Sequence, residues 1–488
     1  MRQMKWVVVA MFGMGLIGCG KQATDSGNGN DAGAGSLGGL FGVQPKASGG
    51  ATPAGTAGAS PNPISMTEAD QALFSQLNQD QLYYTRDESK PGQPIVAVST
   101  AFGGTLTLQS IQMIAKFPSI TSIRLKSLTK PIQEHLPLLR NQLTELDFTE
   151  ADFGDEHLPF LKSFPKLTHL NLNETKITEA GLSEIAKLTQ LTHLSLVAVV
   201  DRNDNALGDG IAVLAALPRL ESLDVSITRL SDAGLAKLGT FPALKVLKCQ
   251  EIAITGKGFA GLTKLKNLTE LDVGQVGGMT DAYLTPIGNL SNLTKLDLSG
   301  TNLGENAMKA IGKCTKLTDL KLGVQLNGRL MQELSGLTQL TTLSVNGTEQ
   351  GDELIPIIAR FPNLKSLTLT FVNVSDRGVA ALANARSLEV CKIDECELTD
   401  ASLATFAKLP NLTELSITGA ILGDNGVSAL ASAPKLTRLT LRGKALSDAA
   451  EPALSRLTQL KQLKIGGPKV TEKARNSLRQ TLKIDIGS

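Results

Sequence analysis

Three side chains that could bind a metal ion recur at one position of a periodic pattern. Glu145, His169 and His193 follow one another at intervals of about 24 residues, and each stands directly before a leucine. If each interval contains one short strand, the three side chains lie on adjacent strands about 5 Å apart. Imidazole and carboxylate groups at that separation could share a divalent cation such as zinc. Two histidines on an exposed sheet face are the alternative, because no further ligand or supporting hydrogen-bond partner is evident.

A second set of polar side chains stands at or near the position two residues later in the same pattern. Its acidic members gather in the first half of the chain and its basic members in the second. We interpret them as candidates for contacting a partner protein: Asp147, Asn171, Asp224, Lys248, Asp272, Asp297, Lys321, Lys392, Arg438 and Arg442. Aromatic anchors are scarce among them, so a solvated face without a dedicated partner is the open alternative.

The elements that position these residues follow from the run Leu-x-x-Leu-x-Leu, which recurs from Ile120 to Leu460. In the copy that begins at Leu167, Leu170 and Leu172 alternate with polar residues, which predicts a short strand with one buried face. The apolar residues between 182 and 188 then fall at helical spacing, which predicts a short helix. Each repeat therefore reads as a strand, a loop and a helix.

Small residues mark where each predicted helix begins. Serine or threonine stands at the expected N-cap in several repeats, namely Thr178, Ser231, Thr280, Ser375 and Thr399. Glycines follow at Gly181, Gly234, Gly378 and Gly426. Because glycine is costly inside a helix, we expect close contact between neighbouring repeats at these positions.

The repeat pattern resembles a known family. Residues 167–182 and 220–235 are similar to the ribonuclease-inhibitor and F-box class of leucine-rich repeats, and the resemblance covers about residues 95–486. It implies an α/β fold, a right-handed leucine-rich-repeat solenoid or horseshoe with a parallel sheet on its concave face and short helices on its convex face. An F-box-like segment is absent from the sequence, so a ubiquitin-ligase role is not carried over.

Such repeats present binding surfaces and seldom catalyse reactions. We therefore expect a protein that binds an unidentified protein partner, with no cofactor and no enzymatic activity. A structural scaffold of the cell envelope without a dedicated ligand is one alternative. Binding of a divalent metal at Glu145, His169 and His193 is the other.

The first residues resemble a bacterial lipoprotein signal. Arg2 and Lys5 precede an apolar stretch that is too short to span a bilayer. It ends in Leu16-Ile-Gly-Cys19, which is similar to a lipobox and implies lipidation of Cys19. An ordinary signal peptide with a chance cysteine is the alternative. Gly20 after that cysteine resembles the signal for sorting to the outer membrane, so we expect an exported protein anchored to the envelope, most simply in that membrane.

These observations predict five segments along the chain. They are a signal peptide at 1–18, a lipidated Cys19 with a Gly/Ala/Ser/Pro-rich disordered tether at 19–64, an N-terminal cap at 65–119, about fifteen repeats at 120–469 and a C-terminal cap at 470–488. The second cap reads as an amphipathic segment followed by a closing strand at 482–486.

Charge and cysteine content narrow the choice of partners. The formal net charge of +2 falls to zero when Arg2 and Lys5 leave with the signal peptide, which argues against nucleic acid as a partner. Cys249 and Cys391 occupy positions normally filled by leucine, so we expect buried thiols. Cys391 and Cys396 are near enough in sequence to form a disulfide, and unpaired thiols are the alternative.

Overall fold

The computed structural model describes residues 68–100, 103–199 and 207–487. The predicted signal peptide, Cys19 and the tether lie outside these residues. None of the described helices is both long and apolar enough to cross a membrane.

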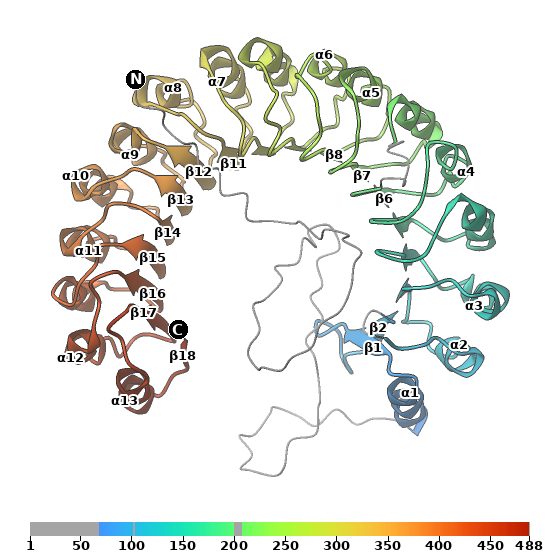
Figure 1. Cartoon of the computed structure of the whole chain (residues 1–488), viewed down its shortest axis with the longest axis horizontal. Helices are drawn as coiled ribbons and strands as arrows, with labels where there is room; N and C mark the ends of the chain where they lie inside the picture. The colour runs from blue at the N-terminus through green and yellow to red at the C-terminus, as the bar shows by residue number, and fades with distance from the viewer. Residues whose placement is uncertain (1–67, 101–102, 200–206, 488) are drawn as a thin grey trace, which may run out of the picture. The chain divides into compact units, whose positions relative to one another are not determined.

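Fifteen short strands of the described residues form the repeats of one open, parallel sheet, which confirms the predicted α/β horseshoe. The strands line the inner face of a curved array and the helices line its outer face (Figure 1). The strands are β3 (Ser122–Arg124), β4 (Glu145–Asp147), β5 (His169–Asn171), β6 (His193–Ser195), β7 (Ser222–Asp224), β8 (Val246–Lys248), β9 (Glu270–Asp272), β10 (Lys295–Asp297), β11 (Asp319–Leu322), β12 (Thr342–Thr348), β13 (Ser366–Val372), β14 (Val390–Asp394), β15 (Glu414–Ala420), β16 (Arg438–Gly443) and β17 (Gln462–Gly466).

Leucines form a continuous core between the two layers. Each strand pairs with the next so that the same repeat position lies side by side, as Leu170 does with Leu194 and Leu296 with Leu320. These side chains are almost fully buried. A single repeat could not bury its leucines alone, so the stability of the fold arises from contacts between neighbours.

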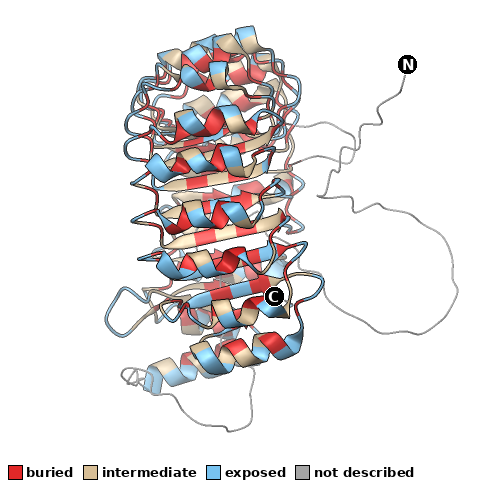
Figure 2. Ribbon diagram, turned by 90° about the vertical axis from the view of Figure 1, so that its left-hand side faces the viewer, coloured by how far each residue is buried: buried red, intermediate tan, exposed pale blue. Residues whose placement is uncertain are grey.

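The convex layer mixes α-helices with 3₁₀ segments. The α-helices of the repeats and their approaches are α2 (Leu108–Ile114), α3 (Lys130–His135), α4 (Leu182–Ile185), α5 (Asp232–Leu238), α6 (Phe259–Leu262), α7 (Glu305–Ile311), α8 (Gly328–Gln332), α9 (Gly351–Ile358), α10 (Asp376–Val379), α11 (Asp400–Ala407) and α12 (Glu451–Leu454). The 3₁₀ segments are η1 (Leu136–Leu139), η2 (Asp155–Ser163), η3 (Asp209–Ala216), η4 (Asp281–Asn289), η5 (Ala380–Asn384), η6 (Gly426–Ser432) and η7 (Asp448–Ala450). In the C-terminal repeats each helix carries buried residues on one side and exposed residues on the other (Figure 2).

The two ends of the array are built differently from the repeats. At the N-terminal end, α1 (Glu68–Gln79) precedes an antiparallel pair, β1 (Tyr83–Arg86) and β2 (Ile95–Ser99), and β2 pairs in parallel with β3. At the other end, α13 (Glu472–Leu482) is followed by β18 (Ile486–Gly487). The predicted closing strand at 482–486 was therefore wrong in its bounds. Leu482 ends the helix, and Lys483 turns the chain with a left-handed backbone before β18 begins.

Aspartates bind one repeat to the next at the start of the convex layer. Each accepts hydrogen bonds from the backbone N–H and the hydroxyl of a serine or threonine 23 residues later, in the pairs Asp155–Thr178, Asp232–Thr255, Asp352–Ser375, Asp376–Thr399, Asp424–Ser447 and Asp448–Thr471. A carboxylate that accepts two such bonds satisfies donors that a helix start leaves without partners. This role of aspartate was not predicted from the sequence, although the constant interval of 23 residues between each aspartate and its serine or threonine is visible there.

The predicted hydroxyl caps are confirmed only in part. Ser231 and Thr399 accept N–H groups of their own helices. Ser375 and Thr280 make no such bond, and the Ser375 hydroxyl donates to Asp352 instead. Thr178 accepts from the Ala180 N–H, but its α-helix begins later in the chain.

The predicted close contact at the glycines is confirmed, and aspartate is its cause. A Cβ atom on Gly181 would stand 2.1 Å from Asp155 Oδ1, and one on Gly378 would stand 2.1 Å from Asp352 Oδ1. Only glycine leaves room for the carboxylate that reaches across from the preceding repeat.

Candidate functional site

Glu145, His169 and His193 lie in register on β4, β5 and β6, as the spacing predicts. The two imidazole rings stack with their centroids 4.1 Å apart and their planes 11° from parallel. Each Nδ1 atom lies 2.9 Å from the hydroxyl of the preceding threonine, Thr168 or Thr192. The face thus contains a stacked pair of rings whose Nδ1 atoms have hydroxyl neighbours.

This arrangement does not form the metal site proposed from the sequence. Burial, together with the charge of His193, lowers the pKa of His169 to about 4, and burial also lowers the pKa of His193. Burial raises the pKa of Glu145, although a hydrogen bond from Ser122 opposes it. No three His, Cys, Asp or Glu side chains within the described ranges are placed to hold a metal ion. Adjacent register alone was not sufficient, because the rings stack instead of converging with Glu145 on one point.

The outward aspartates and Asn171 of β4 to β10 accept hydrogen bonds from the backbone of their own repeats. One side-chain oxygen in each accepts the N–H two residues later, which forms a turn at the end of the strand. The pairs are Asp147–Thr149, Asn171–Asn173, Asp224–Ser226, Asp272–Gly274 and Asp297–Ser299, with N···O distances of 2.8, 3.0, 3.0, 3.2 and 2.9 Å. Since that N–H bonds to a side chain, the regular ladder is interrupted there and these strands stay three residues long, although the next N–H in the chain still donates to the following repeat in several of them, as Glu150 does to Asn173.

Two strands of this half carry neither aspartate nor asparagine at that position, and their neighbours supply the missing acceptor. Val197 N–H, beyond the end of β6, donates to Asn173 Oδ1 at 2.8 Å. Gln250 N–H, beyond the end of β8, donates to Ser226 Oγ at 3.1 Å. The repeat before them therefore ends these strands.

Burial separates these carboxylates from solvent. Asp224, Asp272 and Asp297 are 7%, 9% and 8% exposed. Burial and the adjacent Asp297 raise the pKa of Asp272 to about 6. Burial also raises the pKa of Asp224, against hydrogen bonds from Ser226. Their position on the concave face is as predicted. One oxygen of each accepts a backbone N–H, and the other oxygen of Asp272 and of Asp297 meets Gln250 or Lys321, so these carboxylates offer little surface to a partner.

The strands of the C-terminal half are longer and expose their outward side chains. In β12 and β13 the ladder continues past the position of the turn, with Val345 paired to Leu369 and Asn346 to Thr370. The residues of this half at the predicted positions are Ser344, Thr368, Lys392, Ser416, Thr440 and Lys464, and all of them are half-buried or exposed. Phe371 stands at the edge of this face with 60% of its surface exposed.

The predicted basic residues lie on this longer-stranded part. Lys392, Arg438 and Arg442 are exposed on β14 and β16. Glu414 on β15 lies between the first two, 2.8 Å from Lys392 Nζ and 2.7 Å from Arg438 Nε. Burial would raise the pKa of Glu414, but hydrogen bonds from both cations outweigh it and lower the value. The sequence analysis did not identify Glu414, although it occupies the same column as Arg438.

The remaining predicted cations pair within the sheet nearer its middle. Lys321 Nζ lies 2.8 Å from Asp297 Oδ2, and Lys248 Nζ lies 3.7 Å from Glu270 Oε1. The fold therefore places all ten predicted contact residues on one face. It spreads them from β4 to β16 and does not gather them into one site.

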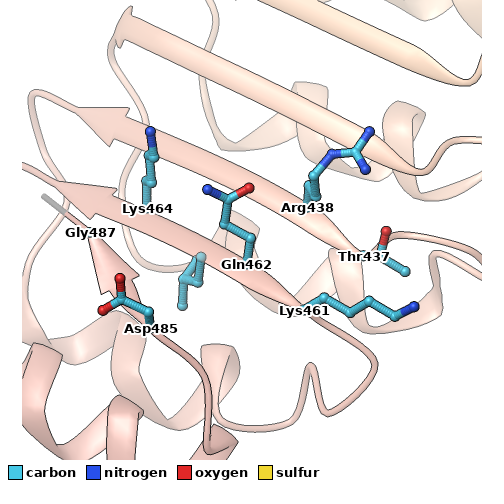
Figure 3. A pocket seen from close by; sticks show the side chains of 8 residues that line it. Thr437, Arg438, Lys461, Gln462, Lys464, Asp485 and Gly487 are labelled. Atoms are coloured by element: carbon cyan, nitrogen blue, oxygen red, sulfur yellow. The ribbon is translucent and has the colours of Figure 1, made fainter. Parts of the chain in front are cut away.

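An open hollow of about 410 Å³ lies at the C-terminal end of the sheet. Its lining consists of Thr437, Arg438, Lys461, Gln462, Leu463, Lys464, Asp485 and Gly487 (Figure 3). Six of these eight residues have polar side chains, so the hollow suits a charged or hydrogen-bonding group. The sequence analysis had not identified Gln462 or Asp485 as members of this surface.

The cysteines follow the inward positions predicted for them. Cys249 and Cys391 are buried in the core. Burial raises the pKa of the Cys391 thiol to about 12 and that of the Cys396 thiol to about 11. The considered disulfide between them is absent, since both thiols are free.

Comparison with known proteins gives three kinds of likeness. Residues 165–186, 289–312 and 408–431 match the family described as Leucine Rich repeat. An internalin of Listeria monocytogenes and a leucine-rich-repeat protein of Leptospira interrogans each share 20% identity and a TM-score of 0.49 with the chain. The first likeness covers 75% of this chain and 93% of the internalin, and the second covers 78% and 94%.

A curated relative matches a smaller part. A protein of Caenorhabditis elegans, named as a candidate RNA-binding protein, is 29% identical over 135 residues, or 28% of this chain. The chain spans 15% of the length of that relative.

The matched segments coincide with repeats whose strand, loop and helix have been described above. Their leucines form the core that unites the array, and their polar positions form its concave face. Three segments of the chain thus match the leucine-rich-repeat family, and the folded chain is an array of leucine-rich repeats.

Proposed function

We propose that this chain is a lipid-anchored protein of a bacterial envelope that binds a protein partner through the concave strands β12 to β17. Leucine-rich-repeat arrays in general present extended concave binding surfaces. The proposal adds the anchor, the envelope location and the part of the face that makes contact.

The exposure of side chains along β12 to β17 carries this choice of face. In β4 to β10 the outward aspartates and Asn171 are used by backbone N–H groups. In the longer strands the corresponding serine, threonine and lysine side chains point outward from a regular ladder. A partner that lies on this part meets charged and hydroxyl groups, with the exposed Phe371 at one edge.

The lipid anchor is supported by the sequence. The apolar stretch before Cys19 and the composition of residues 20–64 suit a lipidated N-terminus and a spacer. Such a spacer would hold the repeats clear of the membrane, where a partner can reach the concave face.

Affinity purification from native membranes tests the choice of face. The full chain would be recovered with a C-terminal tag after mild crosslinking, alongside a variant with Thr368→Arg and Ser416→Arg. We expect a partner that the wild type retains and the variant loses, because two long cations block the outward columns of β13 and β15. A partner retained by both proteins would overturn the assignment to this face. Assembly with itself alone would favour the envelope scaffold.

Metabolic labelling tests the anchor separately. We expect an alkyne-labelled fatty acid to be incorporated into the wild-type chain and not into Cys19→Ser, and the variant to leave the membrane fraction. Equal labelling of both chains would refute lipidation at Cys19.

A further inference from the structure

We propose that the C-terminal end of the concave face recognises an acidic peptide segment of the partner, and that Lys461 and Lys464 make the decisive contacts. This inference rests on the proposed function, because it names the chemistry of what the face binds. The observations that carry it are the balance of charge, the polar hollow and the ion pairs that are already formed.

The charges at this end are unbalanced. Lys392, Arg438, Lys461 and Lys464 are exposed there, and the carboxylates beside them are Glu414 and Asp485. Arg442 and Lys444 have Asp394 and Glu395 as acidic neighbours and add nothing to this excess. Glu414 is already held between Lys392 and Arg438. Among the described residues, no carboxylate comes within ion-pair distance of Lys461 or Lys464. These two ammonium groups therefore keep their charge available for a partner.

The positive charges of Lys461 and Lys464 lie at the polar hollow. The hollow lies between β16, β17 and the segment that carries Asp485, and Figure 3 shows Gln462 and Lys464 on β17 and Lys461 directly before it. Strand β18 pairs only with Leu463 and Lys464 of β17, so the sheet beyond β17 is only partly covered. A volume of about 410 Å³ is enough for a few side chains of an extended segment but not for a folded domain.

The chemistry of the lining suits an acidic peptide better than a nucleic acid. Lysine ammonium groups act as point charges, and the Arg438 Nε already donates to Glu414, so the planar fork that suits phosphate is partly occupied. Single-stranded nucleic acid is usually held by aromatic side chains on which bases stack. The hollow contains no aromatic residue among those that line it. An acidic peptide is therefore the partner that these groups fit best.

Fluorescence anisotropy with the full chain tests the inference. The probe is a fluorescein-labelled peptide of alternating glutamate and serine, about twelve residues long, and a peptide with glutamine in place of glutamate is its neutral control. We expect the acidic probe alone to bind, and its Kd to rise severalfold when NaCl is raised from about 50 to 300 mM because the contacts are screened.

Two matched variants locate the contact. Lys461→Glu with Lys464→Glu should raise the Kd by about tenfold or more, because each reversal turns attraction into repulsion. Lys266→Glu with Lys408→Glu makes the same change in charge at exposed positions that follow the convex helices α6 and α11, and should leave the Kd within about twofold. Lys461→Arg with Lys464→Arg should retain binding. Circular dichroism would show that all variants are folded.

The following results would overturn the inference. Equal binding of the neutral peptide would exclude charge recognition, and equal loss in both pairs of charge reversals would exclude this location. Tighter binding of an oligoribonucleotide of the same charge would assign the surface to nucleic acid. If the native partner depends on Thr368 and Ser416 while the acidic probe does not bind, the proposed face stands and the acidic partner fails.

Discussion

Strands β4 to β10 and strands β12 to β17 belong to one sheet and share one leucine core, yet they end in different ways. In the first group the backbone N–H after each strand bonds to a side chain, mostly that of aspartate or asparagine two residues earlier. In the second group the same N–H remains available to the ladder, and all six strands are between five and seven residues long.

The comparison shows how one position of a repeat can serve either the fold or the surface. An aspartate there is drawn to its own backbone and becomes buried, as Asp224 and Asp297 are. In β12 to β17 the serine, threonine or lysine at this position leaves that N–H to the ladder, so the strand continues and the side chain stays outside. Lys248 on β8 is different, because Ser226 of the preceding repeat accepts the N–H instead. Charge in the sequence therefore does not by itself mark a binding surface.

A charged substitution in the core between the two groups should have the largest effect on stability. Leu320 on β11 is fully buried between them, so Leu320→Asp places a charge without a partner in the core. We expect the free energy of unfolding to fall by about 4 kcal/mol or more, or the melt to split into two transitions, measured by circular dichroism. Gln339→Asp, on an exposed turn, is the control. An unchanged melt for Leu320→Asp would refute the register of the repeats.

A feature common to both groups should respond equally in each. Gly181→Ala and Gly378→Ala push a methyl group against Asp155 and Asp352, and we expect each to cost about 1–3 kcal/mol in chemical denaturation. Gly336→Ala meets no atom within 4 Å and should be nearly neutral. A large cost in only one half would show that the aspartate contacts between repeats are not equivalent along the array.

The third experiment tests the difference itself. Asp297→Ala removes the acceptor of the Ser299 N–H and the partner of Lys321, and should cost about 1–2 kcal/mol. Thr440→Ala changes the corresponding position of β16, in the middle of a continuous strand, and should cost less than about 0.5 kcal/mol. Equal costs measured by urea denaturation would contradict a structural role confined to the first group.

The smallest expected effect is a dependence on pH confined to the first group. The pKa of Asp272 is raised by burial to about 6, above its usual value near 4, so the folded state binds its proton more tightly than the unfolded state does. The stability from this proton is fully present below pH 4 and is lost as pH rises through 6.

Asp272→Asn isolates that contribution from the other carboxylates. Between pH 5 and pH 6.5 we expect the wild type to lose about 1 kcal/mol of stability relative to the variant, measured by denaturation at each pH. Lys392→Met in the other half should show no such difference. A wild type that gains stability over this range relative to Asp272→Asn would reverse the sign and refute the raised pKa.

Much of the fold could be predicted because its causes are local and repeated. The period of leucines predicts the strands and their side-by-side register, and the inward positions of Cys249 and Phe148 follow from the same alternation. The candidate site was harder, because whether a polar residue is exposed depends on residues about 24 positions away. The side chain of Gln250 donates to Asp272, and Asn173 accepts from the N–H of Val197. No local sequence pattern predicts either contact.

The sequence by itself determined that the chain is a repeat protein, that about fifteen repeats each contribute one strand to its inner face, and which side chains of those repeats build its core. These properties depend on the period of the leucines, which recurs in every repeat. The tertiary structure alone decided that the histidines stack without forming a metal site, that the aspartates of the first half turn to their backbone, and that Lys461 and Lys464 lie beside one hollow. Those outcomes depend on how each repeat is rotated and packed against the next, because a side chain contacts whatever the neighbouring repeat places beside it.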